Sequence, residues 1–559
     1  MNRSLRYVTL IAALIILSSA TKWPFSMIAT EKVINPAPLP SRQKVLLIPL
    51  DSRPPCTEFV VNLGKLSGIE IILPPSSYIG NYEQPGNQPA LRQWLAETID
   101  QADAAIISSD MLIHGGLLAS RQSRGTPDDV SATLALLSQI HNQKPQIPIY
   151  VFSIIPRLLL ADSPSGSYWQ KPLSDYSVLK HQVSLFDNPR DLHKLLEWEQ
   201  TIPPKFINNY RALYEQSTNI NKALINLANR GVITTLTLGQ DDGQPFGLPN
   251  LSKEKLLHYA SQSNTLSHRV TITRGTDEVA LTLLGHYANT INNYKPRIFI
   301  AWSHPKSPTM VMPFMPHSTA RTAEEKIALI GGQSVSTANE ADFILYIHTG
   351  NRDIKPSQLT AAAKTVDQFI RQGYQVAIVD LTENYFAHET LLPYLVENNV
   401  DLTKLVAYAG WNTTSNSIGT AITQGTLFTG SLRSIPDSDK LSMYSAHLNF
   451  LTSRFLDDWH YLKDIQPVIN HDLKAAKINP YHLGNNYSIT NQRIMRLLTS
   501  RGAYFFRHSL AGRTIVVSNT EYQLADMSLK CKLPWDRTFE ISLQTHLGFS
   551  EIKNTDNQP

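Results

Sequence analysis

Val232-Ile233-Thr234-Thr235-Leu236-Thr237-Leu238 is followed directly by Gly239-Gln240-Asp241-Asp242-Gly243. The first seven residues are apolar or β-branched, which is typical of a buried strand. In parallel α/β folds the ligand lies at the carboxyl ends of the strands. The stretch therefore predicts a buried parallel strand with a pair of adjacent carboxylates at the end where such folds place their chemistry.

Nine further segments share this strand character and alternate with helical patterns. The other strand candidates are residues 45–50, 69–73, 104–108, 147–155, 270–273, 297–302, 343–348, 376–380 and 405–409. Helices are predicted at residues 88–101, 126–142, 207–230, 277–292, 357–372 and 388–398. Strands that alternate with helices indicate a parallel sheet. We expect an α/β fold built as a (β/α)8-type barrel with extra N-terminal α/β strands, although a pair of doubly wound sheets would give a similar pattern.

The two ends of the chain differ from this α/β body, which spans residues 44–430. Residues 1–20 combine two arginines with an apolar stretch and small residues, as a signal peptide or an uncleaved anchor does. The proline-containing residues 21–43 indicate a linker, and residues 431–559 predict a C-terminal region of helices and a small β structure. We therefore expect a periplasmic or secreted protein, with membrane tethering only through the N-terminal segment.

Charge and cysteine content argue against several functional classes. The 559 residues include 50 basic and 46 acidic side chains, with no block of Lys and Arg suited to a nucleic-acid backbone. Cys56 and Cys531 are too few for a disulfide scaffold, and whether they pair is open. The sequence has no Gly-x-Ser-x-Gly elbow, phosphate-binding loop or dinucleotide fingerprint. We expect no nucleic-acid partner and no cofactor.

The adjacent carboxylates suit acid/base chemistry, and we predict Asp241 and Asp242 as the catalytic residues. Two close carboxylates repel each other, so the pKa of one rises and a proton donor lies beside an anion. Both side chains reach one pocket only if the strand ends or bulges there, which Gly239 and Gly243 permit. In the alternative interpretation Asp241 caps an ordinary turn and Asp242 is solvated.

Polar side chains follow many of the other strand candidates and would converge on the same face of a parallel fold. We predict that the following residues bind the substrate: Asp51, Arg53, Asp110, His114, Arg352, Asp380, Trp411, Asn412 and Asn416. A tryptophan face packs against a sugar ring, and asparagine amides bind hydroxyl or acetamido groups, so this set favours a carbohydrate substrate. Alternatively, Trp411 fills the barrel mouth and the amides bind loop backbone.

A metal site is the second interpretation of part of this set. Asp51, Asp110 and His114 are residue types that bind metals, and they would suit a metal-dependent hydrolase. However, no two histidines near these strands have a metal-binding spacing such as His-x-x-x-His. We therefore predict no metal ligands.

The chain resembles an uncharacterised bacterial family that is classed as a domain of unknown function. This resemblance spans almost the whole body and implies no particular activity. It rests on Ile48-Pro49-Leu50-Asp51-Ser52-Arg53-Pro54-Pro55, Ser109-Asp110-Met111-Leu112-Ile113-His114-Gly115-Gly116, Gly239-Gln240-Asp241-Asp242, Gly410-Trp411-Asn412-Thr413-Thr414-Ser415-Asn416 and Leu533-Pro534-Trp535-Asp536-Arg537-Thr538-Phe539-Glu540.

Asp241-Asp242 and Trp411-Asn412 also resemble motifs of the family-84 glycoside hydrolases, the O-GlcNAcase-like β-N-acetylhexosaminidases. The resemblance implies that Asp241 orients and polarises the substrate acetamido group, whose oxygen attacks the anomeric carbon. It implies that Asp242 is the general acid and then the general base, and that Asn412 binds the sugar. The chain departs from that family in having no proline after Asn412, and in having Asn416 near the position of an expected aspartate.

From these observations we expect an exported glycoside hydrolase that acts on N-acetylated amino sugars of envelope glycans. Two alternatives remain open at this point. One is a metal-dependent hydrolase such as a deacetylase, and the other is a non-catalytic glycan-binding or envelope-assembly protein.

Overall fold

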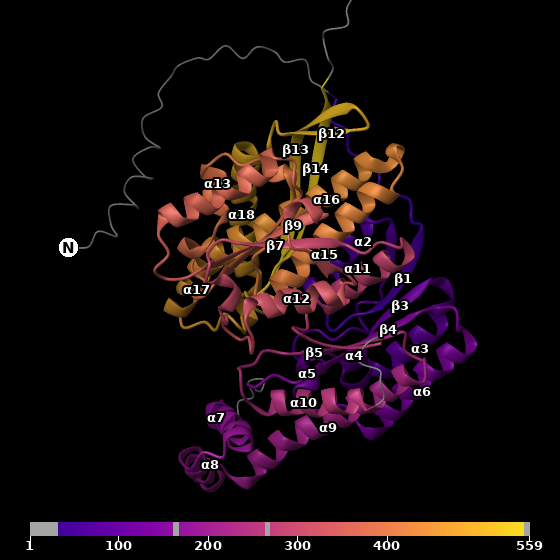
Figure 1. Cartoon of the computed structure of the whole chain (residues 1–559), viewed down its shortest axis with the longest axis vertical. Helices are drawn as coiled ribbons and strands as arrows, with labels where there is room; N and C mark the ends of the chain where they lie inside the picture. Colours follow the sequence, from indigo (N-terminus) through magenta and orange to yellow (C-terminus); the bar gives the residue numbers. More distant parts are fainter. Residues whose placement is uncertain (1–31, 160–166, 263–268, 553–559) are drawn as a thin grey trace, which may run out of the picture.

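The computed structural model describes residues 32–159, 167–262 and 269–552. The expected signal peptide at residues 1–20 lies outside these ranges. The described chain forms two parallel sheets with helices on their faces and a small antiparallel sheet near its C-terminal end (Figure 1).

The first sheet has six parallel strands in the order β2-β1-β3-β4-β5-β6. Its strands are β1 (Gln43–Ile48), β2 (Ile69–Ile72), β3 (Ala104–Ser108), β4 (Ile149–Ile155), β5 (Thr235–Gln240) and β6 (Val270–Arg274). The helices of this part are η1 (Pro54–Cys56), α2 (Glu58–Leu66), α3 (Gln88–Thr98), η2 (Ile99–Gln101), α4 (Ser109–His114), α5 (Leu117–Ser120), α6 (Pro127–Gln143), α7 (Ser167–Phe186), α8 (Pro189–Thr201), α9 (Pro204–Asn229) and α10 (Leu248–Ser261).

The second sheet has five parallel strands in the order β11-β10-β9-β7-β8. Its strands are β7 (Arg297–Trp302), β8 (Gln333–Ser334), β9 (Phe343–Gly350), β10 (Val376–Thr382) and β11 (Leu405–Ala409). The helices of this part are α11 (Val279–Ile291), η3 (Ser307–Thr309), α12 (Thr319–Leu329), η4 (Ala338–Glu340), α13 (Pro356–Arg371), η5 (Ala387–Glu389), α14 (Leu392–Glu397), η6 (Leu402–Lys404) and α15 (Thr414–Ser434).

Both sheets place their first strand between their second and third strands. This order is that of doubly wound α/β folds, whereas consecutive strands around a (β/α)8 barrel are neighbours. The parallel α/β class is therefore confirmed, but the expected (β/α)8 barrel is not, because the described strands pair into two separate sheets. The result fits the alternative of two doubly wound sheets.

The strands are buried because helices cover both faces of each sheet. On β1, Val45 and Leu47 pack into one apolar cluster with α2 and α11, and Leu46 and Ile48 pack into another with α3, α6 and α9. The first of these clusters also contains residues of β9, β10 and α15. The helices α2, α11 and α15 therefore form the layer between the two sheets (Figure 1).

All ten strand candidates are strands, with small shifts at their ends. The strand of the opening motif, β5, begins at Thr235 rather than Val232 because Gly231, at a φ of 79°, turns the chain after α9. It then continues through Gln240, so Asp241 follows it directly. The short strand β8 was not predicted, nor were the helices α2, α4, α5, α7, α8, α10, α12 and α15.

The C-terminal region begins with a long continuous helical segment. It consists of α16 (Lys440–Arg454), the π-helix η8 (Phe455–Ile465) and α17 (Gln466–Ala475). The remaining elements are η7 (Asp437–Asp439), η9 (Gly484–Asn486), α18 (Tyr487–Phe505), the π-helix η10 (Phe506–Leu510) and the antiparallel strands β12 (Thr514–Val517), β13 (Thr520–Lys532) and β14 (Ser542–Glu551). Part of the predicted linker contacts this sheet, because Ile34 and Phe549 exchange two backbone hydrogen bonds.

The structure also bears on the two cysteines and on membrane-spanning helices. Cys56 and Cys531 are both buried and both free, so they do not form a disulfide. Within the three described ranges, no helix has the length and apolar character needed to cross a membrane.

Candidate functional site

A cavity of about 1620 Å³ lies at the carboxyl edge of the first sheet. Its walls come from the loops after β1, β3, β4, β5 and β6, from the loop between β11 and α15, from α7 and α9, and from the C-terminal region. In a doubly wound sheet the ligand binds outside the carboxyl ends of the strands, where the strand order reverses. Here that point lies between β1 and β3, and the loops after both strands line the cavity.

Two glycines shape the loop that follows β3 and α4. Gly115 and Gly116 have φ values of 90° and 126°, in the left-handed region that favours glycine. A Cβ on Gly115 would lie 2.7 Å from the Cβ of Pro85, and one on Gly116 would lie 3.2 Å from the carbonyl oxygen of Leu50. The close approach at these glycines is thus between parts of the chain itself, and both residues line the cavity.

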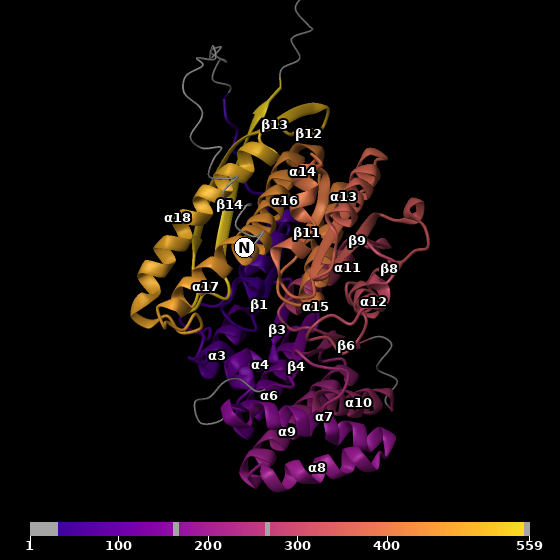
Figure 2. The same ribbon diagram turned by 90° about the vertical axis from the view of Figure 1, so that its left-hand side faces the viewer.

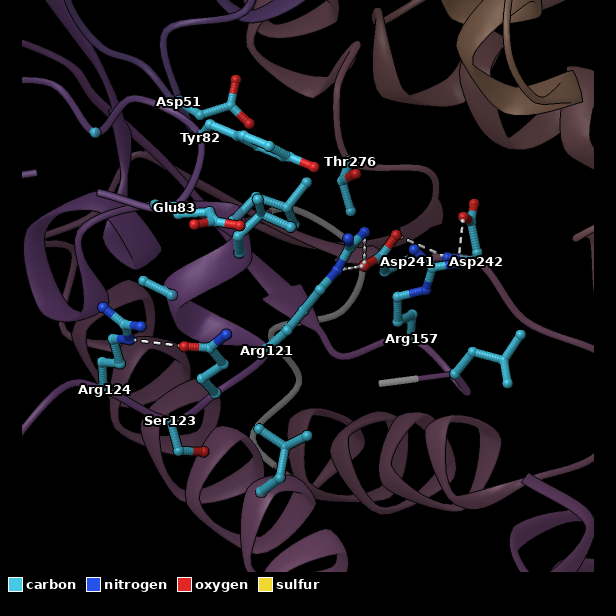
Figure 3. Close-up of a pocket in the computed structure, with 18 of the residues that line it drawn as sticks. Asp51, Tyr82, Glu83, Arg121, Ser123, Arg124, Arg157, Asp241, Asp242 and Thr276 are labelled. Atoms are coloured by element: carbon cyan, nitrogen blue, oxygen red, sulfur yellow. Dashed lines mark hydrogen bonds and ion pairs between the residues drawn. The ribbon is translucent and has the colours of Figure 1, made fainter. Parts of the chain in front are cut away.

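The acidic pair lies at the end of β5, as the sequence predicts, and both carboxylates line the cavity (Figure 3). Asp241 is buried and Asp242 is half-buried. The backbone N–H of Asp241 donates to the carbonyl of Ile155 at 3.1 Å, which continues the contact with β4. The backbone N–H of Asp242 donates to Oδ1 of Asp241 at 2.9 Å, so the two residues are also linked directly.

Two arginines flank the pair, one beside each carboxylate (Figure 3). Arg121, just after α5, donates from Nε to Oδ2 of Asp241 at 2.8 Å, and its Nη2 lies 2.7 Å from the same oxygen. Arg157, after β4, places Nη2 3.4 Å from Oδ2 of Asp242. The carboxylate of Asp241 is therefore held much more tightly than that of Asp242.

This asymmetry separates the pKa values of the pair. Burial alone would raise the pKa of Asp241, but the guanidiniums of Arg121 and Arg157 outweigh it and lower that pKa below its usual value. Burial and the neighbouring charge of Asp241 raise the pKa of Asp242 to about 6. An anion and a proton donor thus lie side by side, which is the arrangement that charge repulsion predicts.

A second ion-pair cluster surrounds Arg53. Its Nη2 lies 2.7 Å from both Oδ2 of Asp51 and Oδ1 of Asp277, and its Nε donates to Asp51 at 2.9 Å. All three side chains are buried at the wall of the cavity. Because two carboxylates share one guanidinium, this part of the wall carries net negative charge and offers acceptors for hydroxyl groups.

Aromatic side chains from two distant parts of the chain form another part of the wall. Tyr82 and Trp535 stack with ring centroids 5.3 Å apart, and the indole N–H of Trp535 donates to Oγ of Ser52 at 2.9 Å. The guanidinium of Arg537 lies 4.7 Å from the ring centroid of Tyr82, 4.6 Å from that of Trp535 and 5.1 Å from that of Phe539. Phe539 remains 38% exposed and offers an apolar face to a ligand.

The second sheet contributes the loop between β11 and α15. Asn412, Thr413 and Asn416 from this loop and the start of α15 line the cavity. Asn416 is 4% exposed, and its Oδ1 has no hydrogen-bond donor among the described residues. An unpaired buried amide oxygen that lines a cavity is well placed to accept a hydrogen bond from a ligand.

Asp110 and His114 lie on α4, outside the large cavity, and line a much smaller one. Asp110 accepts a hydrogen bond from the backbone N–H of Ile154 at 3.0 Å, and burial raises its pKa to about 7. His114 accepts from the N–H of Gly125 at 2.9 Å, and burial lowers its pKa to about 4. Asp51 lines the large cavity instead, and the described part of the chain has no group of three or more His, Cys, Asp and Glu side chains placed to hold a metal ion.

Three other predicted residues also lie outside the large cavity. Trp411 is buried between the sheets, packs edge-on against Phe59 and donates from Nε1 to Thr420, so it forms part of the core. Asp380 is buried and accepts hydrogen bonds from the backbone of Leu391. Arg352 is exposed in the turn after β9. The cavity therefore brings together Asp241, Asp242, Asp51, Arg53, Asn412 and Asn416.

Sequence reasoning selected Arg53 but not the other arginines or the aromatic residues of the cavity. Arg157 is a polar residue that follows a strand, so its position carried a signal, whereas Arg121 comes after a short helix and gave none. Trp535, Arg537 and Phe539 belong to a motif that carries the resemblance, but their distance from the strands in the sequence hid their place in the site. These residues are brought to the cavity only by the packing of the C-terminal region.

Comparison with known families shows which family the chain belongs to. Residues 45–544 match the model of the family described as Protein of unknown function (DUF4127), and the chain belongs to this family. The match confirms the first resemblance. No curated protein matches the chain. Neither result concerns the family-84 glycoside hydrolases, so that resemblance remains a prediction.

Proposed function

We propose that the protein is an exported glycoside hydrolase that acts on N-acetylated amino sugars of envelope glycans, with Asp241 and Asp242 as its acid/base pair. The opposite displacement of their two pKa values, at one wall of a large cavity, is the observation that carries the proposal. Substrate-assisted hydrolysis requires an ionised carboxylate beside a protonated one. Export rests on the N-terminal sequence alone.

In the first step Asp242, protonated below a pH of about 6, donates its proton to the glycosidic oxygen as that oxygen leaves the anomeric carbon. The acetamido oxygen of the same sugar attacks the anomeric carbon and forms a cyclic oxazolinium ion, which keeps the proton on nitrogen. Asp241 stays ionised and accepts a hydrogen bond from the acetamido N–H. Its Oδ1 already accepts one hydrogen bond, from the backbone of Asp242, and retains a lone pair for this purpose.

In the second step Asp242 changes from general acid to general base. Asp242, now a carboxylate, takes a proton from a water molecule, and the resulting hydroxyl attacks the anomeric carbon. The oxazolinium ring opens, the acetamido group is restored with its N–H, and Asp242 is protonated again. The half-buried position of Asp242 is compatible with this exchange of protons with water.

The rest of the cavity supports a sugar polymer as the substrate class. Its volume of about 1620 Å³ exceeds the roughly 300–1,000 Å³ of typical small-molecule pockets, which suits more than one sugar ring. The exposed face of Phe539 offers a platform for the apolar side of a ring, and Oδ1 of Asn416 offers an acceptor for a hydroxyl or an amide N–H.

The test compares wild type with Asp242→Asn on aryl glycosides, with and without a 2-acetamido group, and on envelope glycans. We expect wild type to hydrolyse the 2-acetamido substrates and the variant to lose roughly 10²-fold or more in turnover, the usual size of a general-acid contribution. The loss should be smallest for leaving groups that need no protonation, such as dinitrophenolate.

Other results would argue against this mechanism or favour another function. Equal turnover by wild type and Asp242→Asn would remove Asp242 from the mechanism. Glycan binding without any turnover would favour the non-catalytic alternative, and loss of activity with a chelator, restored by a metal ion, would favour the metal-dependent hydrolase.

A further inference from the structure

Arg274, at the carboxyl end of β6, is a buried charge without a hydrogen-bond acceptor. Its side chain is 1% exposed, and Nε, Nη1 and Nη2 all lack an acceptor among the described residues. The residue lies outside the large cavity, although Gly275, which follows it, lines that cavity. The proposed acid/base chemistry therefore makes no use of this guanidinium.

The nearest acid compensates this charge only in part. Oε1 of Glu325, on α12, lies 3.9 Å from Nη2 of Arg274, which is too long for a hydrogen bond. The same Oε1 lies 3.4 Å from Nε of Arg321, and Oε2 of Glu325 has no donor among the described residues. One carboxylate is thus shared between two guanidiniums.

Two more basic side chains lie at the same place. Lys253, on α10, is 7% exposed, and its pKa is lowered to about 7 by burial and then by the charge of Arg274. The pKa of His317, just before α12, is lowered to about 3 by burial and then by Arg274, Lys253 and Arg321. Figure 2 shows β6 between α10, which carries Lys253, and α12, which carries Arg321.

The neighbouring carboxylate of Glu278 does not neutralise the positive charge of Arg274, because Glu278 is paired with Lys326. Nζ of Lys326 lies 2.5 Å from Oε1 of Glu278 and donates to the carbonyl oxygen of Arg274, so the opposite charges of Lys326 and Glu278 offset each other. Glu278 therefore offers no counter-charge to the guanidinium of Arg274. An uncompensated buried guanidinium is expensive, because desolvation of an ion costs several kcal/mol, a large part of the stability of a folded protein.

We infer that Arg274, Lys253 and Arg321 form a binding site for a small tetrahedral oxoanion of the phosphate or sulfate type. The planar guanidinium of Arg274 can contact two oxygens at once, and the ammonium of Lys253 supplies a further donor. The side chain of Arg321 is 59% exposed, so the cluster reaches solvent at that end. Arg321 also lies in the first turn of α12, where the helix dipole adds positive potential.

The full chain is tested in phosphate-free buffer at neutral pH and constant ionic strength set with chloride. Inorganic phosphate and inorganic sulfate are titrated separately by calorimetry and in thermal unfolding. In wild type we expect binding of one anion per chain and a rise of a few degrees in the unfolding temperature at saturation. The two titrations decide which anion is preferred.

Three variants make the test specific. Arg274→Met and Lys253→Met should both lose the calorimetric binding and the thermal shift. Arg92→Gln is the matched control, because it breaks an Arg–Asp pair with Asp129 elsewhere in the chain, and it should keep both effects. In chloride buffer Arg274→Met should unfold at or above the wild-type temperature, because an unpaired buried charge has been replaced by an apolar side chain.

The inference is overturned if neither anion binds wild type, or if Arg274→Met and Lys253→Met retain the binding. A thermal shift of equal size in all four proteins would show a general salt effect and would also overturn it. If Arg274→Met fails to fold, which itself contradicts the expected stabilisation, Lys253→Met still decides whether the anion binds at this place.

Discussion

Nη2 of Arg121 lies 2.7 Å from Oδ2 of Asp241, and this contact determines which carboxylate of the acidic pair holds the proton. It lowers the pKa of Asp241, whose remaining charge then helps to raise the pKa of its neighbour Asp242. The arginine comes from a loop after β3 and the carboxylate from the end of β5, so the pair is set by the packing of one sheet edge rather than by local sequence.

Arg121→Gln should move the low-pH limb of the pH profile of kcat/KM upward. Without the guanidinium the pKa of Asp241 rises, so Asp241 is ionised only at higher pH. The displacement should be about one pH unit or more, the usual effect of an opposite charge at this distance. Steady-state hydrolysis of a 2-acetamido aryl glycoside across the pH range measures it.

Arg92→Gln is the control for this variant as well, because its pair with Asp129 lies outside the cavity. Its pH profile should match that of wild type. An unchanged low-pH limb in Arg121→Gln would mean that Asp241 is not the ionised group on which activity depends.

Asp110→Asn should change the pH dependence of stability. The pKa of Asp110 is raised to about 7 in the folded protein, so between pH 4 and 7 the unfolded chain is ionised while the folded chain keeps the proton. This group therefore contributes less to stability as the pH rises through that window, by up to about 1.4 kcal/mol per pH unit. Asparagine does not titrate and can still accept the hydrogen bond from Ile154.

Urea unfolding of wild type and Asp110→Asn at pH 5 and pH 8 measures this difference. The variant should gain stability relative to wild type as the pH rises. A difference that is constant with pH would show that Asp110 titrates normally in the folded state, and would reopen a direct role in the site.

The fold was predictable to the level of its strands, and its topology was not. A strand that is buried on both faces, such as β3 or β11, appears in the sequence as a run of apolar residues. Strand order leaves no such local mark, since β1 lies between β2 and β3 through contacts that only the folded sheet makes. The alternating pattern therefore could not separate a barrel from two doubly wound sheets.

The same distinction applies to the candidate site. Asp241 and Asp242 were predictable because the end of a parallel strand is a defined place in such folds. Asp380 lies within β10 and Trp411 follows β11, but both strands belong to the second sheet, and both side chains are used in its packing. Arg537 could not be placed from the sequence, since it reaches the cavity from the far end of the chain.

Gly275→Ala should destabilise the loop that joins β6 to the cavity. Gly275 has a φ of 82°, and a Cβ there would lie 2.2 Å from Oε1 of Glu278 and 2.5 Å from Oγ of Ser415. We expect a loss of at least about 2 kcal/mol in the free energy of unfolding, from backbone strain and from displacement of a buried carboxylate. Urea unfolding provides the measurement.

Gly373→Ala separates these two causes. Gly373 has a φ of 85°, but a Cβ there meets nothing within 4 Å, so only the backbone strain remains. Its loss should be clearly smaller, about 1 kcal/mol. Equal losses in the two variants would show that the contact of Gly275 with Glu278 carries no energetic weight.

Phe539→Ala should weaken substrate binding and leave the chemical step intact. The ring is 38% exposed at the cavity wall and has no ionisable group, so it can contact a ligand but cannot take part in proton transfer. An interaction of equal strength in the ground state and the transition state raises KM on removal and leaves kcat unchanged. Tyr504→Ala is the matched control, because that ring is 57% exposed and lies outside the cavity. Steady-state kinetics on an envelope glycan should show a higher KM for Phe539→Ala alone, and a fall in kcat at constant KM would instead place the ring against the transition state.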